Sequence, residues 1–453
     1  MKTVSARTFY ACSGCGSVFA RWMGQCPDCG AWDTLLEERG PGPDRKKPGR
    51  KLANAASAVT SLADLRTDQA VVLPSGIGEF DNILGGGAVP GSTVLVGGEP
   101  GIGKSTLLLQ AAGRFAQRGF ATLYVSGEES ATQIKRRAER LGIRSELSIL
   151  TETNLAAILS AVEHSKPRVL IVDSIQTVSD PDLQSAPGTV SQVRDCAAAI
   201  SDWARRSDAV ALLVGHVTKD GFLAGPKVLE HLVDTVLQFE GDRRHWVRIL
   251  RCTKNRYGAT HEVGLFEMTE HGLTELTDPS ARFLSDAGSH GPGSAVGVAL
   301  EGRRPLLLEI QALVGQTNGT PQRVVAGLDS RRIAILGAVL QNVAGVQLAG
   351  RDVYANVLGG YMTDEPAVDL AAAMAIASSA LKRATPERSV FIGEVGLSGD
   401  IRSVPQLAQR LIVAEKGGFT SAIVPALDLK RSALSGEIEP KPVTTISQAL
   451  EML

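Results

Sequence analysis

The sequence has few aromatic residues and almost no net charge. Aromatic residues make up 4% of its 453 residues, and 47 Lys and Arg stand against 48 Asp and Glu, which leaves a formal charge of −1. A near-neutral chain gives no overall electrostatic case for binding a polyanion, so any such site must be a local patch. Few aromatics beside 48 glycines suit an α/β protein with cores of Ala, Val and Leu.

The sequence also lacks long apolar runs. No run approaches the ~20 residues that cross a bilayer, and residues 1–20 lack the apolar core of a signal peptide. We therefore expect a cytoplasmic protein with no membrane partner. Its six cysteines then indicate metal ligands or core thiols, because disulfides are rare in the cytosol.

The length predicts about three domains, at roughly 100–200 residues each. A run rich in Pro, Gly and basic residues, 40-GPGPDRKKPGRK-51, indicates a flexible linker. Further on, short apolar runs alternate with helical patterns, which predicts a parallel, doubly wound sheet. The predicted units are a four-Cys finger (1–35), the linker (36–54), an α/β domain (55–284) and a unit of mixed strands and helices (285–453).

Two pairs of cysteines lie near the start of the chain. Two residues separate Cys12 from Cys15 and, likewise, Cys26 from Cys29, and glycines accompany both pairs. Four thiolates in this pattern are typical of a tetrahedral Zn²⁺ site. Because four protein ligands close such a site, we expect a structural metal and no catalytic one.

Other residues of these types are expected to lie in cores. Trp22 and Trp32 are predicted to pack on the small core of the finger. Cys196 lies at helical spacing from Val193 and Ile200, which predicts a buried thiol on the apolar face of a helix.

The run 93-TVLVGGEPGIGKSTLLLQ-110 predicts a strand, a loop and a helix. It contains the P-loop pattern Gly-x4-Gly-Lys-Ser, whose glycines let backbone N–H groups curl around phosphates. Lys104 would neutralise charge on the β- and γ-phosphates, Ser105 would supply an oxygen to Mg²⁺, and the positive end of the helix favours the same anion. The predicted ATP contacts are Gly98, Glu99, Pro100, Gly101, Ile102, Gly103, Lys104, Ser105 and Thr106.

Acidic side chains follow two of the predicted strands. Asp173 ends the apolar run 169-VLIVD-173, where a second carboxylate would hold Mg²⁺ through water. Glu128 and Glu129 follow a strand that ends at Ser126, beside the P-loop. Glu128 is our preferred base for the attacking water and Glu129 the alternative. Both could instead be acidic residues favoured at a helix N-terminus.

His216 follows the predicted strand 209-AVALLVG-215 and is a candidate γ-phosphate sensor, although a lone histidine is more often structural. The next loop, 218-TKDGFLAGPK-227, contains Lys219 and Lys227 among three glycines. Such a loop suits the backbone of single-stranded DNA, or it is an ordinary surface loop.

A small basic turn, 254-KNRYG-258, follows the strand-like run 246-WVRILRC-252. The residues alone leave three partners open for Lys254 and Arg256, namely solvent, nucleic acid and a phosphate.

Taken together, these segments resemble the RadA/Sms family of bacterial DNA repair and recombination ATPases over nearly the whole chain. The family has Phe where this chain has Tyr257, which keeps the ring. The segments that carry the resemblance are the four-Cys finger, 74-PSGIGEFDNILGGGAVPGS-92, 97-GGEPGIGKST-106, 127-GEES-130, 215-GHVTKDG-221, 230-EHLVD-234 and 254-KNRYG-258.

The resemblance implies a RecA-like ATPase core for residues 55–284. It favours Glu128 as the base and His216 as the sensor, and it implies that the loops after Asp173 and His216 face DNA. It also implies that Lys254 and Arg256 reach the γ-phosphate of a neighbouring subunit, as an arginine finger does. Direct contact with DNA is the alternative for this pair.

Residues 285–453 resemble the proteolytic domain of Lon, through 363-TDEPAVDLAAAMAIAS-378 and 391-FIGEVGLSGDIRSVPQLAQRLIVAEKGGFTSAIVP-425. The nucleophilic serine of Lon falls on Ala367, and its lysine falls on Ala408. A methyl group is neither nucleophile nor base, so we expect no peptidase activity.

The resemblance implies an ATP hydrolase that uses Mg²⁺ and carries structural Zn²⁺. We expect a homohexameric motor, stimulated by single-stranded or branched DNA, which promotes branch migration beside the RecA recombinase in the response to DNA damage. The alternative is a non-motor ATP switch of the KaiC type that regulates partner proteins.

Overall fold

The protein is described here from a computed structural model. It divides into two compact units, Met1–Glu275 and Leu276–Leu453, and the finer boundaries expected from the sequence stay predictions. Cys15, Cys29, Lys219 and Lys227 lie outside the described residues, as does most of the expected linker. The described residues are 7–12, 18–27, 30–32, 34–40, 72–183, 185–216, 228–241, 247–260, 262–276, 283–285, 291–317, 319–429 and 436–453.

A small antiparallel sheet begins the first unit. Its strands are β1 (Arg7–Cys12), β2 (Val18–Phe19) and β3 (Leu35–Gly40), in the order β2-β1-β3. Where burial is described in this part, Cys12, Cys26 and Leu35 are buried together, and Tyr10, Phe19 and Met23 pack against them.

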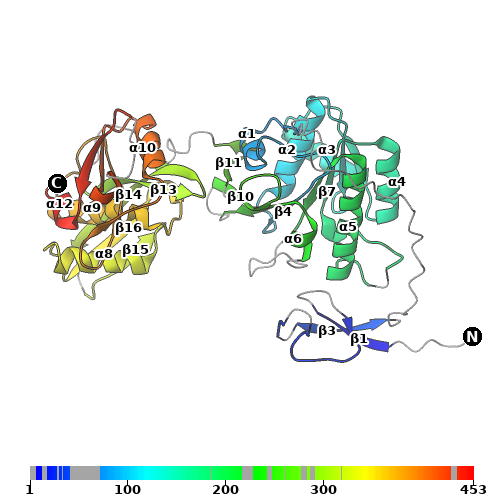
Figure 1. Ribbon diagram of the computed structural model, residues 1–453, viewed down its shortest axis with the longest axis horizontal. Coiled ribbons are helices and arrows are strands. Elements are labelled where there is room, and N and C mark those ends of the chain that lie inside the picture. Colours follow the sequence, from blue (N-terminus) through cyan, green and yellow to red (C-terminus); the bar gives the residue numbers. More distant parts are fainter. Residues whose placement is uncertain are drawn as a thin grey trace, which may run out of the picture. The chain divides into compact units, whose positions relative to one another are not determined.

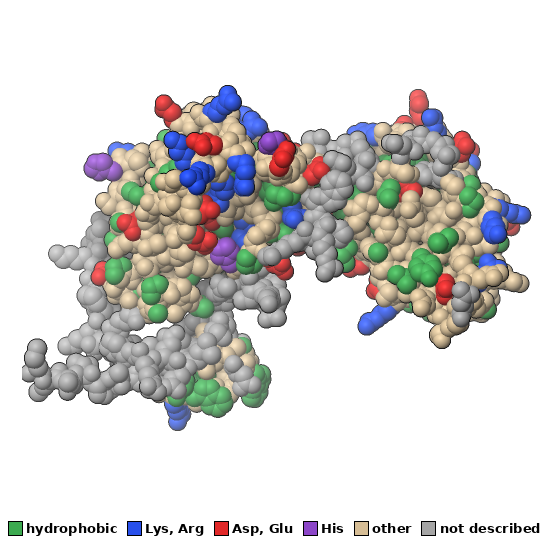
Figure 2. Space-filling model, turned by 180° about the vertical axis from the view of Figure 1, so that it is seen from behind, with side chains coloured by type: hydrophobic (Ala, Val, Ile, Leu, Met, Phe, Trp, Pro, Cys, Tyr) green, Lys and Arg blue, Asp and Glu red, His purple; other side chains and the backbone are tan. Residues whose placement is uncertain are grey.

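The prediction that both tryptophans of the finger pack on its core was wrong. Trp22 is 54% exposed and Trp32 is 70% exposed, and Figure 2 shows hydrophobic side chains gathered on this part of the surface. The two rings converge beside Gly24, where an added Cβ would lie 3.8 Å from each. The core around Cys12 and Cys26 is filled by smaller side chains.

A nine-stranded sheet forms the centre of the first unit (Figure 1). Six neighbouring strands, β9-β4-β8-β7-β5-β6, are parallel, and β10, β11 and β12 extend one edge in antiparallel fashion. The strands are β4 (Thr93–Gly98), β5 (Thr122–Ser126), β6 (Ser148–Thr151), β7 (Val169–Asp173), β8 (Val210–Val214), β9 (Thr235–Glu240), β10 (Val247–Asn255), β11 (Val263–Thr269) and β12 (Gly272–Glu275).

Helices cover both faces of this sheet because the central strands are apolar on both sides. In β7, Val169 and Ile171 join one core cluster, while Leu170 and Val172 join the other. The first cluster includes residues of α1 (Gly78–Ile83), α2 (Lys104–Gln117) and α3 (Ala131–Arg140). The second includes residues of α4 (Leu155–Ser165), α5 (Val190–Ser207) and α6 (Val228–Leu232), among them the predicted core thiol of Cys196.

The second unit contains a mixed seven-stranded sheet in the order β15-β16-β14-β13-β17-β20-β21. α9 packs on β13 and β14, and α8 packs on α9. The strands are β13 (Ser294–Glu301), β14 (Arg304–Gln316), β15 (Arg323–Ala326), β16 (Arg351–Val357), β17 (Ser389–Phe391), β20 (Ser421–Pro425) and β21 (Glu439–Val443), with a separate pair, β18 (Glu394–Val395) and β19 (Ile401–Arg402). The α-helices are α8 (Ser330–Asn342), α9 (Asp369–Leu381), α10 (Leu407–Lys416), α11 (Ala426–Leu429) and α12 (Ile446–Leu450).

The two alanines at the Lon serine and lysine positions lie on segments that an ion pair joins. Ala367 is buried in the short 3-10 helix Pro366–Val368, and Ala408 lies in the first turn of α10. Glu365, just before the 3-10 helix, pairs with Arg410 of α10, whose side chain is fully buried.

Candidate nucleotide-binding site

The loop between β4 and α2 has a backbone shape that requires glycine. Gly98, Gly101 and Gly103 have φ angles of 155°, 78° and 120°, in or near the left-handed region where a side chain is strained. At Gly98 an added Cβ would also lie 2.9 Å from the Cβ and the carbonyl oxygen of Phe239. α2 begins directly after this turn, at Lys104, so its N-terminal N–H groups face the loop and can bind an anion.

Lys104 lies folded into its own loop. Its Nζ donates to the carbonyl oxygens of Gly98 (2.7 Å) and Glu99 (2.9 Å), and the residue is only 3% exposed. Burial lowers the pKa of Lys104 to about 8, against the opposing influence of Asp173, Glu128 and Glu99. The ammonium group must therefore exchange two backbone partners for phosphate oxygens when a nucleotide binds.

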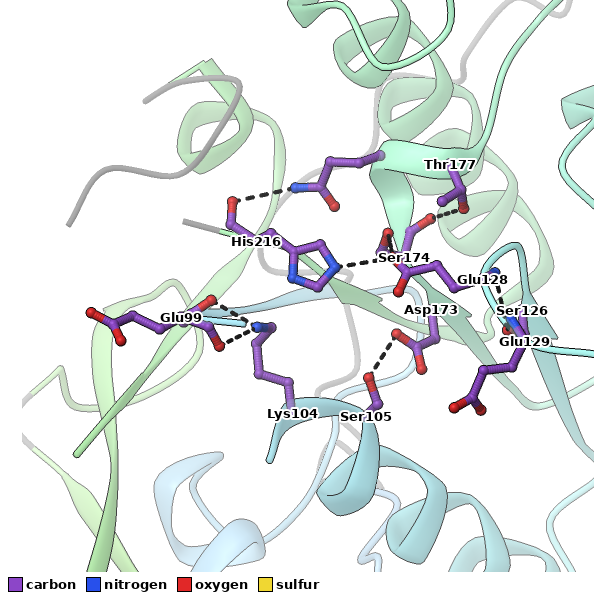
Figure 3. A network of polar contacts seen from close by, with 12 residues as sticks. Glu99, Lys104, Ser105, Ser126, Glu128, Glu129, Asp173, Ser174, Thr177 and His216 are labelled. Carbon is purple, nitrogen blue, oxygen red and sulfur yellow. Dashed lines mark hydrogen bonds and ion pairs between the residues drawn. The ribbon is translucent and has the colours of Figure 1, made fainter. Parts of the chain in front are cut away.

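Ser105 and Asp173 meet beside the loop. The Ser105 hydroxyl donates to Oδ1 of Asp173 at 3.0 Å, across from α2 to the end of β7 (Figure 3). A hydroxyl and a carboxylate are hard oxygen donors of the kind that Mg²⁺ prefers, usually together with substrate phosphates and water. The two residues fit the Mg²⁺ of a bound nucleotide, and the described residues offer no group of three or more His, Cys, Asp or Glu for a metal.

Glu128 is held by two side chains from neighbouring strand ends. Its Oε1 accepts a hydrogen bond from the Ser174 hydroxyl at 2.6 Å and lies 3.0 Å from Nε2 of His216 (Figure 3). Burial raises the pKa of Glu128, but the bonds from Ser174 and His216 lower it by more, so it ends below its usual value. The Glu128 carboxylate is thus a weaker base than that of a free glutamate, and Ser174 and His216 hold it in place.

Glu129 takes a different direction from Glu128. Its Oε1 pairs with Nη1 of Arg137 on α3 at 3.1 Å. Nη2 of Arg137 donates to the hydroxyl of Tyr124 at 3.1 Å. The adjacent glutamates thus face separate groups of partners, and our preference for Glu128 as the base stays a prediction.

Sequence reasoning missed Ser174, Tyr124 and Arg137. Tyr124 lies inside a buried strand and Arg137 lies in the last turn of a charged helix, so each resembles an ordinary core or surface residue. Ser174 offered a signal, because it directly follows Asp173 at a strand end where other polar site residues gather.

Lys254 and Arg256 lie away from the P-loop of their own chain. β10 runs on to Asn255, so Lys254 belongs to the strand and pairs with Val236 of β9. Gly98 pairs with Phe239, three residues, or roughly 10 Å, further along β9. Lys254 donates to the carbonyl oxygens of Glu230 and Val233, while the half-exposed Arg256 pairs with Asp234 at 3.2 Å.

Cys12 and Cys26, the two described cysteines of the finger, are each 1% exposed and share one core cluster. Two buried thiols in one cluster fit part of a four-thiolate Zn²⁺ site, and the other two predicted ligands lie outside the described residues. Separately, none of the helices in the described part of the chain is long and apolar enough to cross a membrane.

Three family models match successive parts of the chain. The model of a rubredoxin metal binding domain matches residues 10–37, that of a AAA domain matches 74–221, and that of subunit ChlI of Mg-chelatase matches 318–428. With the sheets described above, they confirm the predicted fold class, an N-terminal zinc ribbon, a RecA-like α/β ATPase core and a Lon-like C-terminal unit.

Curated relatives match nearly the whole chain. DNA repair protein RadA of Bacillus subtilis (strain 168) is 44% identical over 449 residues, which are 97% of both chains. The RadA proteins of Streptococcus pyogenes serotype M1 (45%, covering 97% of both chains) and Brucella abortus strain 2308 (47%, covering 92% of both) are similar too. The solved ATPase domain of G40P covers 46% of this chain and 92% of its own, with 15% identity and a TM-score of 0.41, too low to bear on function.

The lowered pKa of Lys104 predicts that nucleotide affinity falls at alkaline pH. Phosphates bind the ammonium form and raise its pKa in the complex, so affinity is complete below the free pKa of about 8 and is lost as pH rises above it. We expect a loss of about tenfold between about pH 7 and pH 9. Binding of a fluorescent ATP analogue across this range measures it.

The matched control is Lys104→Arg, whose guanidinium stays charged throughout. It should bind the analogue with an affinity that does not change over the same range, even if weakly. An equally flat profile for the unmodified protein would contradict the prediction.

Proposed function

Because the chain belongs to the family of the bacterial DNA repair protein RadA, we propose that it is a DNA-stimulated ATPase of recombination and repair. It acts in the cytoplasm as a ring, with six subunits expected, on single-stranded and branched DNA. There it drives branch migration of recombination intermediates beside the RecA recombinase. In this proposal the Lon-like unit supports assembly and has no peptidase activity.

The observation that carries the proposal is that Ser174 and His216 both contact the carboxylate of Glu128. Ser174 opens the segment after β7, and His216 directly precedes residues 217–227, and both contact the same carboxylate oxygen. Gln176 of the first segment also donates to the carbonyl oxygen of His216, at 3.4 Å. A ligand that moves either segment therefore changes the partners of Glu128. DNA is the ligand we propose, with Lys219 and Lys227 on its phosphates.

Hydrolysis follows from the strand ends that meet at the loop. Backbone N–H groups of residues 98–106, except Pro100, would bind the β- and γ-phosphates together with Lys104. Ser105 and Asp173 would hold Mg²⁺, which would neutralise phosphate charge. Once Glu128 turns from Ser174 and His216, its carboxylate accepts a proton from the water that attacks the γ-phosphorus, and the bond to the β-phosphate oxygen breaks. His216 then reports whether the γ-phosphate is present.

The position of Lys254 and Arg256 supports a role toward a neighbouring subunit. Both lie near the start of β9, away from the end of β4 that leads into the chain's own P-loop. Arg256 keeps 52% of its side chain exposed, so it can reach outward. We propose that this pair stabilises charge on the neighbour's γ-phosphate, with a DNA contact as the alternative outcome.

If Glu128 is restrained by Ser174, removing that hydroxyl should raise hydrolysis in the absence of DNA. Ser174→Ala removes one hydrogen bond that holds the carboxylate and lowers its pKa. We expect the DNA-free rate to rise about three- to tenfold and the stimulation by DNA to shrink. Steady-state hydrolysis with and without a single-stranded oligonucleotide measures both.

Ser179→Ala is the control, because Ser179 lies in the same segment and its hydroxyl is not one of the Glu128 partners. A Ser174→Ala protein with an unchanged DNA-free rate and full stimulation would sink the coupling model.

The trans arrangement predicts complementation between two inactive proteins. Arg256→Ala should abolish DNA-stimulated hydrolysis, and Lys104→Ala should abolish nucleotide use. In mixed rings, an intact Arg256 from one subunit can face an intact P-loop of another, so some hydrolysis should return. Mass photometry of differently sized fusions establishes that mixed rings form. No recovery in such rings would favour the DNA contact.

A motor should separate strands only when it can hydrolyse ATP. On forked DNA we expect displacement with ATP, and none with a non-hydrolysable analogue or with Glu128→Gln, which removes the base. Gel or fluorescence detection of the released strand measures it. DNA-stimulated hydrolysis without displacement would instead support the non-motor ATP switch.

A further inference from the structure

Asp173 has contacts on both of its carboxylate oxygens. Oδ1 accepts from Ser105 at 3.0 Å, on the side of the P-loop helix. Oδ2 accepts from the hydroxyl of Tyr124 at 2.5 Å and lies 3.7 Å from Nη2 of Arg137. Since Asp173 is only 4% exposed, these neighbours, rather than solvent, set the direction of its carboxylate.

The contacts behind Asp173 form one connected group. Arg137 bonds Tyr124 through Nη2 and Glu129 through Nη1, so one planar guanidinium spans both partners. Arg137 lies in the last turn of α3. The first turn of this helix is fixed by a capping box, in which the side chains of Ser130 and Gln133 each accept a hydrogen bond from the other's backbone N–H. The carboxylate at the end of β7 is therefore braced against the helix that follows the two glutamates.

A purely stabilising role explains this group poorly. Nε of Arg137 and Oε2 of Glu129 are buried and have no hydrogen-bond partner among the described residues. Buried polar atoms without hydrogen-bond partners lower the free energy of unfolding. If Arg137 and Glu129 served only to hold α3 in place, we would expect these two atoms to have partners. Tyr124 and Arg137 do, however, contact Asp173 and orient its carboxylate.

We propose that Tyr124 and Arg137 are positioning residues that aim Asp173 at the Mg²⁺ of the bound nucleotide. Glu129 anchors Arg137 and is not the base. This inference rests on the ATPase part of the proposed function and needs neither DNA nor a ring. Residues that orient metal ligands from behind typically change metal affinity by about 10- to 100-fold when they are altered.

Magnesium dependence of nucleotide binding tests the proposal. We would titrate Mg²⁺ into the full-length protein with a fluorescent, non-hydrolysable ATP analogue, and measure affinity in EDTA separately. Tyr124→Phe and Arg137→Lys should raise the Mg²⁺ concentration for half-maximal binding about tenfold, with affinity in EDTA unchanged. Arg136→Ala, an exposed change one residue away on the same helix, should leave both values unchanged.

The two glutamates provide the second comparison. Glu129→Gln should shift the Mg²⁺ midpoint in the same direction and retain hydrolysis at saturating Mg²⁺. Glu128→Gln should lose hydrolysis with an unshifted midpoint. The reverse pattern would make Glu129 the base and overturn the proposal.

Two other results would also overturn it. If the Mg²⁺ midpoints of Tyr124→Phe and Arg137→Lys equal that of the unmodified protein, these residues do not position Asp173. If the two variants lose nucleotide affinity equally with Mg²⁺ and in EDTA, the residues only support the packing of the site. An ATPase that ignores DNA would refute the proposed DNA motor while leaving these midpoints fully measurable, so the two failures are distinguishable.

Discussion

Parallel register among four strands is the constraint on which the site depends. Ser126 pairs with Asp173 across β5 and β7, and Val96 pairs with Val214 across β4 and β8. The carboxyl ends of these strands therefore open onto the same edge of the sheet. Residues that lie dozens of positions apart in the chain meet there, because each follows its strand by no more than a few residues. A register shift of one residue in β7 would turn Asp173 to the opposite face of the sheet.

This constraint explains which residues could be predicted from the sequence. Lys104, Asp173, Glu128 and His216 each follow or end an apolar run, so pattern alone was enough to bring them together. Tyr124 and Arg137 carry no such mark, because their partners are set by how α3 packs over β5. Trp22 and Trp32 were misplaced because composition does not show which side chains fill a core. Among the described residues, Tyr10, Phe19 and Met23 pack there. The extent of β10 to Asn255 was also beyond the pattern, because Lys254 and Asn255 do not continue the apolar run.

In the second unit, an ion pair joins the two segments that the resemblance to Lon singles out. Ala367 and Ala408 occupy the positions of the nucleophile and the base in the resemblance to Lon, and an ion pair of Glu365 with the buried Arg410 joins their segments. Removing one partner of such an ion pair strongly destabilises a protein, because it leaves the other charge buried and unpaired. The geometry of the two segments is therefore maintained by Glu365 and Arg410.

Glu128 contacts both Ser174 and His216 through the same oxygen, Oε1. A carboxylate has two oxygens, so the second is left out of both contacts. A carboxylate oxygen has two lone pairs, so Oε1 holds both partners at once, and the loss of one contact leaves the other in place. The loss of one contact would free the carboxylate in part, and the loss of both would free it in full. Timing of the chemistry would then reside in one side chain, with no need for a separate regulatory site.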